Sequence, residues 1–349
     1  MYQLSTVSLT LDLIANGNKL QSYVTHIKVY KSLASWLTLI ELKLTIPYHL
    51  LLKLYNAFDN IQFTLIFNKN KQPTSAISGT FLVYNLTLDN TLEKDLPCNV
   101  SLYLVNKPYF EFFREGVDFY SDKPINNIKV LQYLINDKYI RFDPPDKQLT
   151  LYRPFIPYMS RIKALAYACR NFSYSDSMYH GYVDYNGFKL INWNISKSQK
   201  EKYRISFMPN QSQAKEWLID KLYIINRHDY NRRFTGLTYV VEQQTNNAPM
   251  KVMGESNVNP LASISYPSKS IERALQESLQ IYIECIPFYD PFSIDLLDPI
   301  HILTDVAEYQ PYTGYYMITD YLLSCNLSES TFVPYLTLKA SREEVSNSG

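Results

Sequence analysis

Alternating apolar and polar positions recur along most of the chain, and they predict short β-strands. Near the N-terminus, apolar residues occupy every second position from Val7 to Leu13, the pattern of a strand with one buried face. Asn16-Gly17 then provides a hairpin turn signal. The same alternation predicts five more strands, over 23–30, 37–46, 61–67, 80–88 and 100–105. Many short strands joined by short loops are typical of an antiparallel barrel or sandwich.

Helical spacing interrupts this pattern in three places. Residues 48–58 fit one short helix that follows Pro47. Asp122 is the expected cap of a second helix, with Pro124 in its first turn. Ser160 is the expected cap of a third. The apolar stripes of the second and third helices are Ile125, Ile128, Leu131 and Ile135, and Ile162, Leu165, Ala166 and Cys169.

Short strands accompany the second and third helices. A strand is predicted over 148–152, and a hairpin over 182–190 turns at Asn186-Gly187. The segment from 108 to 200 is therefore predicted to be a small α+β unit set between two β segments.

Strand patterns return in the last part of the chain, over 203–207, 236–241, 279–285, 296–306, 314–323 and 332–339. The stretch 211–226 has a mixed pattern that is compatible with a helix. The stretch 243–270 is polar and rich in Asn, Ser and Pro, so a long surface loop is expected there. Residues 341–349 are expected to form a disordered tail.

One group of predicted strands occurs twice in the sequence. Gly79-Thr-Phe-Leu-Val-Tyr-Asn resembles Gly314-Tyr-Tyr-Met-Ile-Thr-Asp at an offset of 235 positions. Upstream, Asp59-Asn-Ile-Gln-Phe resembles Asp298-Pro-Ile-His-Ile, and downstream Val100-Ser-Leu-Tyr-Leu resembles Pro334-Tyr-Leu-Thr-Leu. A recurring order of strands predicts an internal duplication. The division that follows is 1–107 as a first β-barrel, 108–200 as an insert, 201–340 as a second barrel and 341–349 as the tail.

Composition removes several classes of function. The chain has 34 basic and 33 acidic residues among 349, so no global field attracts it to nucleic acid or anionic lipid. It has 9 glycines and neither G-x-G-x-x-G nor G-x-x-x-x-G-K, which excludes the common phosphate-binding loops. No apolar run is long enough to span a membrane and no signal peptide is recognisable, so the protein is expected to be made in the cytoplasm.

No catalytic, cofactor or metal site is predicted. The histidines His26, His49, His180, His228 and His301 never occur as H-x-x-H, and the four cysteines form no C-x-x-C. Glu111 with Glu115, or Asp118 with Asp122, could flank a glycosidic bond, although most such pairs are solvated. Arg227, Arg232 and Arg233 with Tyr230 and Phe234 are the best nucleic-acid candidates, but a solvated loop or interface explains them better in a neutral chain.

The order of elements resembles the tail hub proteins of bacteriophage baseplates and contractile injection systems. The resemblance is carried by three stretches: Phe119-Tyr-Ser-Asp-Lys-Pro-Ile-Asn-Asn-Ile-Lys-Val-Leu, the stretch from Tyr152 to Cys169, and the hairpin from Tyr182 to Ile191. It extends over nearly the whole chain and implies a mainly β, overall α+β fold of two tail-tube-like antiparallel β-barrels with a small α+β insert between them.

The resemblance also implies a function. It implies a homotrimer whose six barrels form a ring on the tail axis, joining a hexameric tail tube to a trimeric central spike or fibre and lining the DNA ejection channel. The implied partners are the tail tube or an adjacent tail protein, the spike or fibre protein and the tape measure protein, with DNA only in transit and no cofactor. The protein would reside in the virion tail after assembly in the host bacterial cytoplasm.

Two other functions remain open at this stage. A carbohydrate-binding β protein of a tail fibre or cell surface would expose an aromatic groove containing Trp36, Trp193 or Trp217. A glycan hydrolase would need a carboxylate pair such as those above.

Overall fold

A computed structural model describes most of the chain. The described residues are 7–88, 96–143, 153–171, 179–193, 196, 199–207, 217–218, 221–226, 237–241, 252–256, 279–285, 290–304, 306–328 and 331–342. The predicted strand over 148–152 and the arginine cluster at 227–233 lie outside these residues. No helix among them is long and apolar enough to cross a bilayer.

The first part of the chain confirms the strand predictions. Its elements are β1 (Val7–Ala15), β2 (Asn18–Lys19), β3 (Val24–Ser32), β4 (Leu39–Pro47), α1 (Tyr48–Tyr55), β5 (Ile61–Lys69), β6 (Gln72–Leu88) and β7 (Pro97–Asn106). Asn16 and Gly17 have φ angles of 48° and 75°, which confirms the predicted hairpin turn. Pro47 is the last residue of β4 and the N-cap of α1. Proline suits this place because it has no N–H to donate to a sheet and its φ is fixed.

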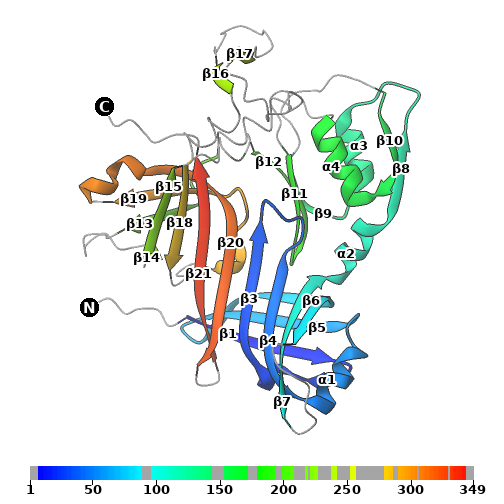
Figure 1. The fold of residues 1–349 in the computed structure, drawn as a ribbon, viewed down its shortest axis with the longest axis vertical. Helices are drawn as coiled ribbons and strands as arrows, with labels where there is room; N and C mark the ends of the chain where they lie inside the picture. The colour runs from blue at the N-terminus through cyan, green and yellow to red at the C-terminus, as the bar shows by residue number, and fades with distance from the viewer. Residues whose placement is uncertain are drawn as a thin grey trace.

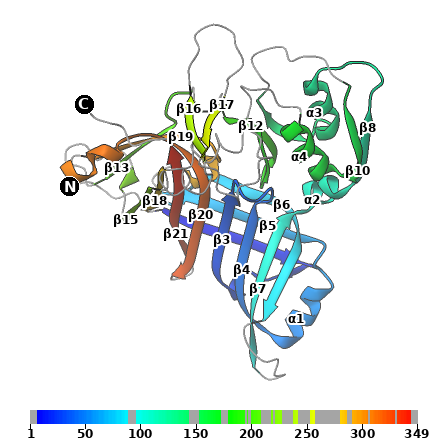
Figure 2. The ribbon, with the colours of Figure 1, turned by 45° about the horizontal axis from the view of Figure 1, so that its top comes forward.

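Among its described residues, the insert contains three helices and two small sheets. Its elements are α2 (Lys107–Arg114), β8 (Gly116–Tyr120), α3 (Asn127–Ile135), β9 (Tyr139–Phe142), β10 (Phe155–Ser160), α4 (Arg161–Asn171), β11 (Tyr179–Asp184) and β12 (Gly187–Asn192). β8 pairs with β10, and β11, β12 and β9 form a second sheet. α3 and α4 lie beside the β8–β10 ribbon, away from the first barrel (Figure 2).

The last part of the chain is again mainly β. Its strands are β13 (Tyr203–Phe207), β14 (Trp217–Leu218), β15 (Lys221–Asn226), β16 (Leu237–Val241), β17 (Val252–Ser256), β18 (Leu279–Cys285), β19 (Pro299–Thr304), β20 (Gly314–Ser328) and β21 (Thr331–Arg342). Most neighbours are antiparallel, but β13 runs parallel to β14 and β19. The mainly β, overall α+β fold is therefore confirmed.

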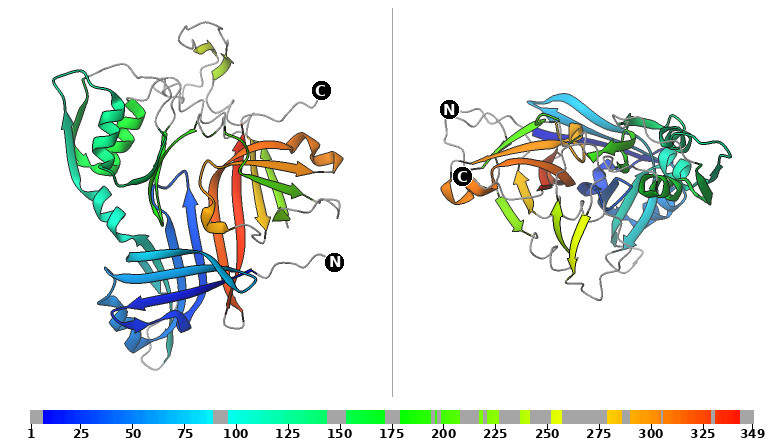
Figure 3. Two further views of the ribbon diagram at one scale, coloured as in Figure 1. Left: turned by 180° about the vertical axis from the view of Figure 1, so that it is seen from behind. Right: turned by 90° about the horizontal axis from the view of Figure 1, so that it is seen from above.

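The long β20–β21 hairpin belongs to both β parts of the molecule (Figure 1). The end of β20 pairs with β3 over Asp320–Asn326, and Phe332 of β21 pairs with Leu9 of β1. These contacts close a ring of eight strands in the order β3, β4, β7, β6, β5, β1, β21, β20. Towards its other end the same hairpin pairs with β19 and β18, as seen from behind in Figure 3. One hairpin therefore joins the two β parts into a single sheet.

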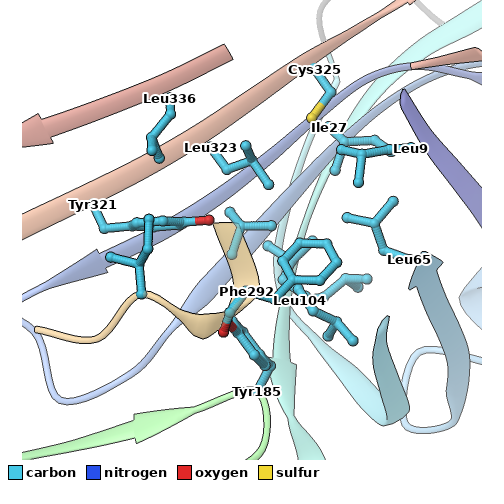
Figure 4. Packing of buried hydrophobic residues seen from close by; sticks show 14 of the residues in the cluster. Leu9, Ile27, Leu65, Leu104, Tyr185, Phe292, Tyr321, Leu323, Cys325 and Leu336 are labelled. Atoms are coloured by element: carbon cyan, nitrogen blue, oxygen red, sulfur yellow. The ribbon is translucent and has the colours of Figure 1, made fainter. Parts of the chain in front are cut away.

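The hydrophobic core follows this sharing of strands. Figure 4 shows Leu9, Ile27 and Leu65 of the first part facing Leu323 and Leu336 of the hairpin. All five side chains are buried. A second cluster fills the insert around Phe113, Leu134 and Phe188. This second cluster is built mainly from insert residues and includes Leu37, Leu82 and Val105 of the first part, whereas the two β parts share the first cluster.

The duplicated strands pair in the same register in both copies. The matched pairs are Phe63–Gly79 with Ile302–Gly314, and Ile61–Phe81 with Ile300–Tyr316. The second strand of each copy has a register shift at the same place, between Val83 and Asn85 in β6 and between Ile318 and Asp320 in β20. The third strands match with a shift of two residues from the sequence resemblance. Leu102 of β7 pairs with Leu86, and the residue paired with the equivalent Tyr321 is Leu338 of β21, not Leu336.

The structure corrects two helix predictions. Asn126, not Asp122, caps α3: its side chain accepts a hydrogen bond of 2.8 Å from the N–H of Ile128. In α4, Ala166 is exposed, and the buried residues are Ala164, Leu165 and Ala168. The helix packs on a face rotated slightly from the predicted stripe, with Ile162 and Cys169 at its edge, partly buried against the second cluster.

Four other segments differ from prediction. The stretch 211–226 contains β14 and β15 and no described helix. β17 lies inside the predicted loop 243–270 and pairs with β16. β21 continues through Arg342, so two residues of the predicted tail 341–349 are strand residues. In the hairpin at 182–190 the turn residues are Tyr185 and Asn186, and Gly187 begins β12 with a φ of 147°.

Candidate functional site

The three parts of the chain meet at a buried network of charged side chains. β3 of the first part contributes Lys31, the β11–β12 hairpin of the insert contributes Asp184 and Lys189, and the segment before β19 contributes Asp295 and Asp298. This group, with Lys202, Arg141 and Asp143 at its rim, is called the junction network below. It has four basic and four acidic members, so its formal charge is balanced.

Backbone contacts set the insert hairpin into this position. The N–H of Val183 donates to the carbonyl of Trp36 at 2.6 Å, and the N–H of Thr38 donates to the carbonyl of Val183 at 2.9 Å. The side chain of Asn106 donates to the carbonyl of Tyr185 at 3.2 Å. The end of β11 is thereby fixed against the loop between β3 and β4.

Lys31 and Asp184 form the centre of the network. Both side chains have 0% exposure, and Nζ of Lys31 lies 3.2 Å from Oδ1 and 3.3 Å from Oδ2 of Asp184. Nζ also donates to the carbonyl of Ile294 at 2.9 Å and to the hydroxyl of Tyr185 at 3.3 Å. A buried charge is tolerated only with such partners, because desolvating an unpaired ion is very costly.

Lys189 extends the network from the insert to the last part of the chain. Its Nζ is 2.8 Å from Oδ2 of Asp184 and also pairs with Asp295. Around this core, Lys202 pairs with Asp298 at 2.8 Å, and Arg141 holds Asp143 through two hydrogen bonds of 3.2 and 3.1 Å. Asp298 further accepts a hydrogen bond of 2.7 Å from the N–H of Asp295.

The pKa values of the network reflect a balance of burial against pairing. Burial lowers the pKa of Lys31 more than Asp184 and Asp295 raise it. Burial also acts to lower the pKa of Lys189, but Asp184 and Asp295 together raise it above its ordinary value. For Asp298, burial raises the pKa, and Lys202 only partly opposes this. Of the two lysines bound to Asp184, Lys189 is therefore the stronger base.

Buried tyrosines surround the network, and because of them we expect the protein to lose stability at alkaline pH. Burial raises the pKa of Tyr182, Tyr185 and Tyr321 well above the ordinary value of 10.0. Above pH 10 the unfolded chain would lose phenolic protons that the folded chain keeps, so the free energy of unfolding should fall. The expected slope is about 1.4 kcal/mol per pH unit for each tyrosine. Unfolding by urea at several pH values above 10 measures it.

Tyr321→Phe is the matched variant for this pH effect. The hydroxyl of Tyr321 is buried and has no hydrogen-bond partner among the described residues, so its removal should cost little at neutral pH. The variant should show a shallower alkaline slope than the native chain. Identical slopes would contradict the assignment, as would tyrosinate absorbance from all three groups at pH 10 in the folded protein.

The carboxylates considered as catalytic pairs from the sequence do not face one another in the structure. Glu115 pairs with Arg161 at 3.1 Å, and Glu111 lies 3.9 Å from Lys107 on the surface of α2. Asp118 and Asp122 are exposed. These positions give each carboxylate a solvated or paired role, and no described contact joins them across a cleft.

The histidines are equally separate. His26 contacts Asn326 and Ser324 across the β3–β20 pairing, and His301 stacks on Tyr315 with ring centroids 4.5 Å apart. His49 is exposed on α1. Within the described part of the chain no three His, Cys, Asp or Glu side chains gather as a metal site.

Two of the three tryptophans pack against neighbouring side chains. Trp193 is buried, and the ring of Trp36 is stacked on Phe110 and packed edge-on to Phe113. The side chain of Trp217 lies outside the described residues. Trp193 therefore does not line an exposed aromatic groove, whereas Trp36 is half-buried.

The junction network was not predicted from the sequence. Its members are spread from Lys31 to Asp298, at spacings that carry no motif. One signal was available. Lys31 occupies an inward position of β3, next to the exposed Tyr30, and Lys189 lies in β12, whose residues are all buried. A lysine at an inward position of a strand implies a buried partner, but not which one.

The fold and the junction network together define a class: a two-part β protein with an α+β insert held by buried ion pairs. The sequence matches no protein-family model. A search of curated proteins also finds no significant match.

Solved structures identify the fold more closely. The tail protein from Neisseria meningitidis MC58 superposes with a TM-score of 0.56 at 8% identity, over 97% of this chain and 98% of that one. The 43 kDa tail protein of prophage MuSo2 from Shewanella oneidensis gives a TM-score of 0.60 at 10% identity, over 96% and 99%. At such low identity the likeness concerns the fold, and at that level it confirms the resemblance to phage tail proteins.

Proposed function

We propose that the protein is a structural component of a phage tail, and that it acts as a trimeric hub. In this role three copies form a ring of six barrels that joins a hexameric tail tube to a trimeric spike or fibre. The ring surrounds the channel through which DNA leaves the particle. This role requires no chemical reaction.

The duplicated strands are the observation that carries the proposal. β5, β6 and β7 repeat as β19, β20 and β21 with the same register and with a register shift at the same residue. Two similar units per chain would let a trimer present six similar faces to a hexamer and three faces to a trimer. A symmetry adaptor needs this duplication, whereas a sugar-binding module does not.

The likeness to solved tail proteins supports the same role. Both matches extend over nearly the whole of this chain and of the other protein, so the insert and the two β parts recur together. The near-neutral charge of the chain also suits a DNA channel, because strong phosphate contacts would retard the passage of DNA.

Electron cryomicroscopy of the parent virion tests the proposal. We expect three copies around the tail axis, with the two β parts of each copy alternating around one ring. The tail tube should lie on one side of the ring and the spike or fibre on the other. A position away from the axis, or a copy number other than three, would contradict the hub role while leaving the fold unchanged.

A further inference from the structure

At the centre of the junction network, a buried amine is in contact with a buried carboxyl group. Nζ of Lys31 is almost equally distant from the two oxygens of Asp184, at 3.2 and 3.3 Å. An amine in that position contacts the carboxyl group whose carbon it would have to attack. Holding two reacting groups together in this way turns a bimolecular step into an effectively unimolecular one.

Both oxygens of Asp184 are held by hydrogen-bond donors. The N–H of Tyr185 donates to Oδ1 at 2.7 Å, and Nζ of Lys189 donates to Oδ2 at 2.8 Å. Attack on a carboxyl carbon places negative charge on its oxygens, and donors already aimed at them stabilise that charge. The arrangement resembles an oxyanion hole built around a side-chain carboxyl group.

The environment of Lys31 favours a nucleophilic amine. Its side chain is fully buried, with Nζ 4.3 Å from the ring centre of Tyr185 and 5.1 Å from that of Tyr321. Burial and the nearby Lys189 ammonium both lower the pKa of Lys31. Lysines that are desolvated or placed beside a second cation are activated as nucleophiles in this way.

We propose that Lys31 and Asp184 join in an intramolecular isopeptide bond. Nζ of Lys31 forms a bond to Cγ of Asp184, and one carbon–oxygen bond of the carboxyl group breaks. The oxygen leaves as water and takes up the two protons that the Lys31 ammonium loses, so the step needs no oxidant or other reactant. Nζ of Lys31 already contacts both oxygens of Asp184, so its protons can pass to the leaving oxygen directly.

The bond would link two separate parts of the molecule covalently. Lys31 lies on β3 of the first barrel and Asp184 at the end of β11 in the insert, 153 residues apart in the chain. The cross-link would prevent the insert from separating from the barrel even when the surrounding hydrogen bonds break. This inference does not depend on the proposed hub function.

Intact mass spectrometry of the native full-length chain under denaturing conditions tests the proposal directly. We expect a mass lower than that of the sequence by one water molecule, and a branched peptide containing Lys31 and Asp184 after digestion. The full sequence mass would overturn the proposal. A water loss that maps to any other pair of residues would overturn it as well.

Two variants sharpen the test. Lys31→Arg keeps the positive charge but removes the amine, so the full sequence mass should return. Lys28→Arg is the matched control, because Lys28 lies on the same strand but pairs with Glu41 near the surface at 3.3 Å. It should keep the water loss. A water loss that persists in Lys31→Arg would contradict the assignment, and the measurement on the native chain decides the matter if that variant fails to fold.

Discussion

Asp184→Ala is expected to lower the free energy of unfolding by about 3–5 kcal/mol, the usual cost of removing one partner of a buried ion pair. The substitution leaves Lys31 with 0% exposure and without its carboxylate, and it also removes one of the two partners of Lys189. The isopeptide bond proposed above would replace this ion pair, and its loss would leave the same buried, unpaired Lys31. Urea unfolding followed by circular dichroism measures the change.

Two controls separate the buried charge from other effects of the substitution. Lys31→Met combined with Asp184→Leu removes both charges and should recover much of the loss, because Lys189 keeps Asp295. Glu111→Ala removes an ion pair whose carboxylate is 60% exposed, and it should change stability by less than about 0.5 kcal/mol. An Asp184→Ala variant as stable as the native chain would show that the junction network does not stabilise the fold.

Gly314→Val is expected to destabilise the protein by about 2–4 kcal/mol, through backbone strain and lost hydrogen bonds. Gly314 has a φ of 129°, which side chains with a Cβ rarely adopt. A Cβ there would lie 2.6 Å from Nη1 of Arg342. That guanidinium donates to the carbonyls of Thr313 and Pro311 at 2.6 and 2.8 Å, so moving it breaks the anchor at the start of β20.

Gly79→Val is the matched control for this prediction. Gly79 occupies the equivalent place in β6, but its φ is not positive, and a Cβ there would meet only a ring carbon of Phe81 at 3.6 Å. Valine also suits a strand, so the change should stay within about 1 kcal/mol. Thermal unfolding of the two variants compares them directly. Equal losses would show that position in the repeat, and not the local backbone, decides the cost.

The two glycines occupy different places in their strands, although the sequences around them are alike. Gly314 is the first residue of β20, whereas Gly79 lies inside β6, which begins at Gln72. In the first copy, β5 is long and connects tightly to β6, which begins well before Gly79. In the second copy, β19 is shorter and β20 begins at Gly314. The conformation of a glycine therefore could not be transferred from one copy to the other.

Local patterns were sufficient for most of the β structure. Alternation located β1, β3, β5 and β18, since a strand with one buried face must place apolar residues at every second position. Helix limits were less certain: Asn126 and Asp122 are both good caps, and only packing selects between them. α2 was missed because its aromatic residues suit a strand as well as a helix.

The chain's amphipathic patterns determined its mainly β class, the α+β insert and the strand duplication, because these depend on residues close together in sequence. The tertiary structure alone decided that β20 and β21 close the first barrel, and that Lys31, Asp184 and Asp295 meet. Both results depend on contacts between residues hundreds of positions apart, such as Leu9 with Phe332. Strands so far apart pair because an entire apolar face of each must be buried, and buried charged side chains meet because each needs a partner of opposite charge. Neither requirement produces a recognisable motif in the sequence.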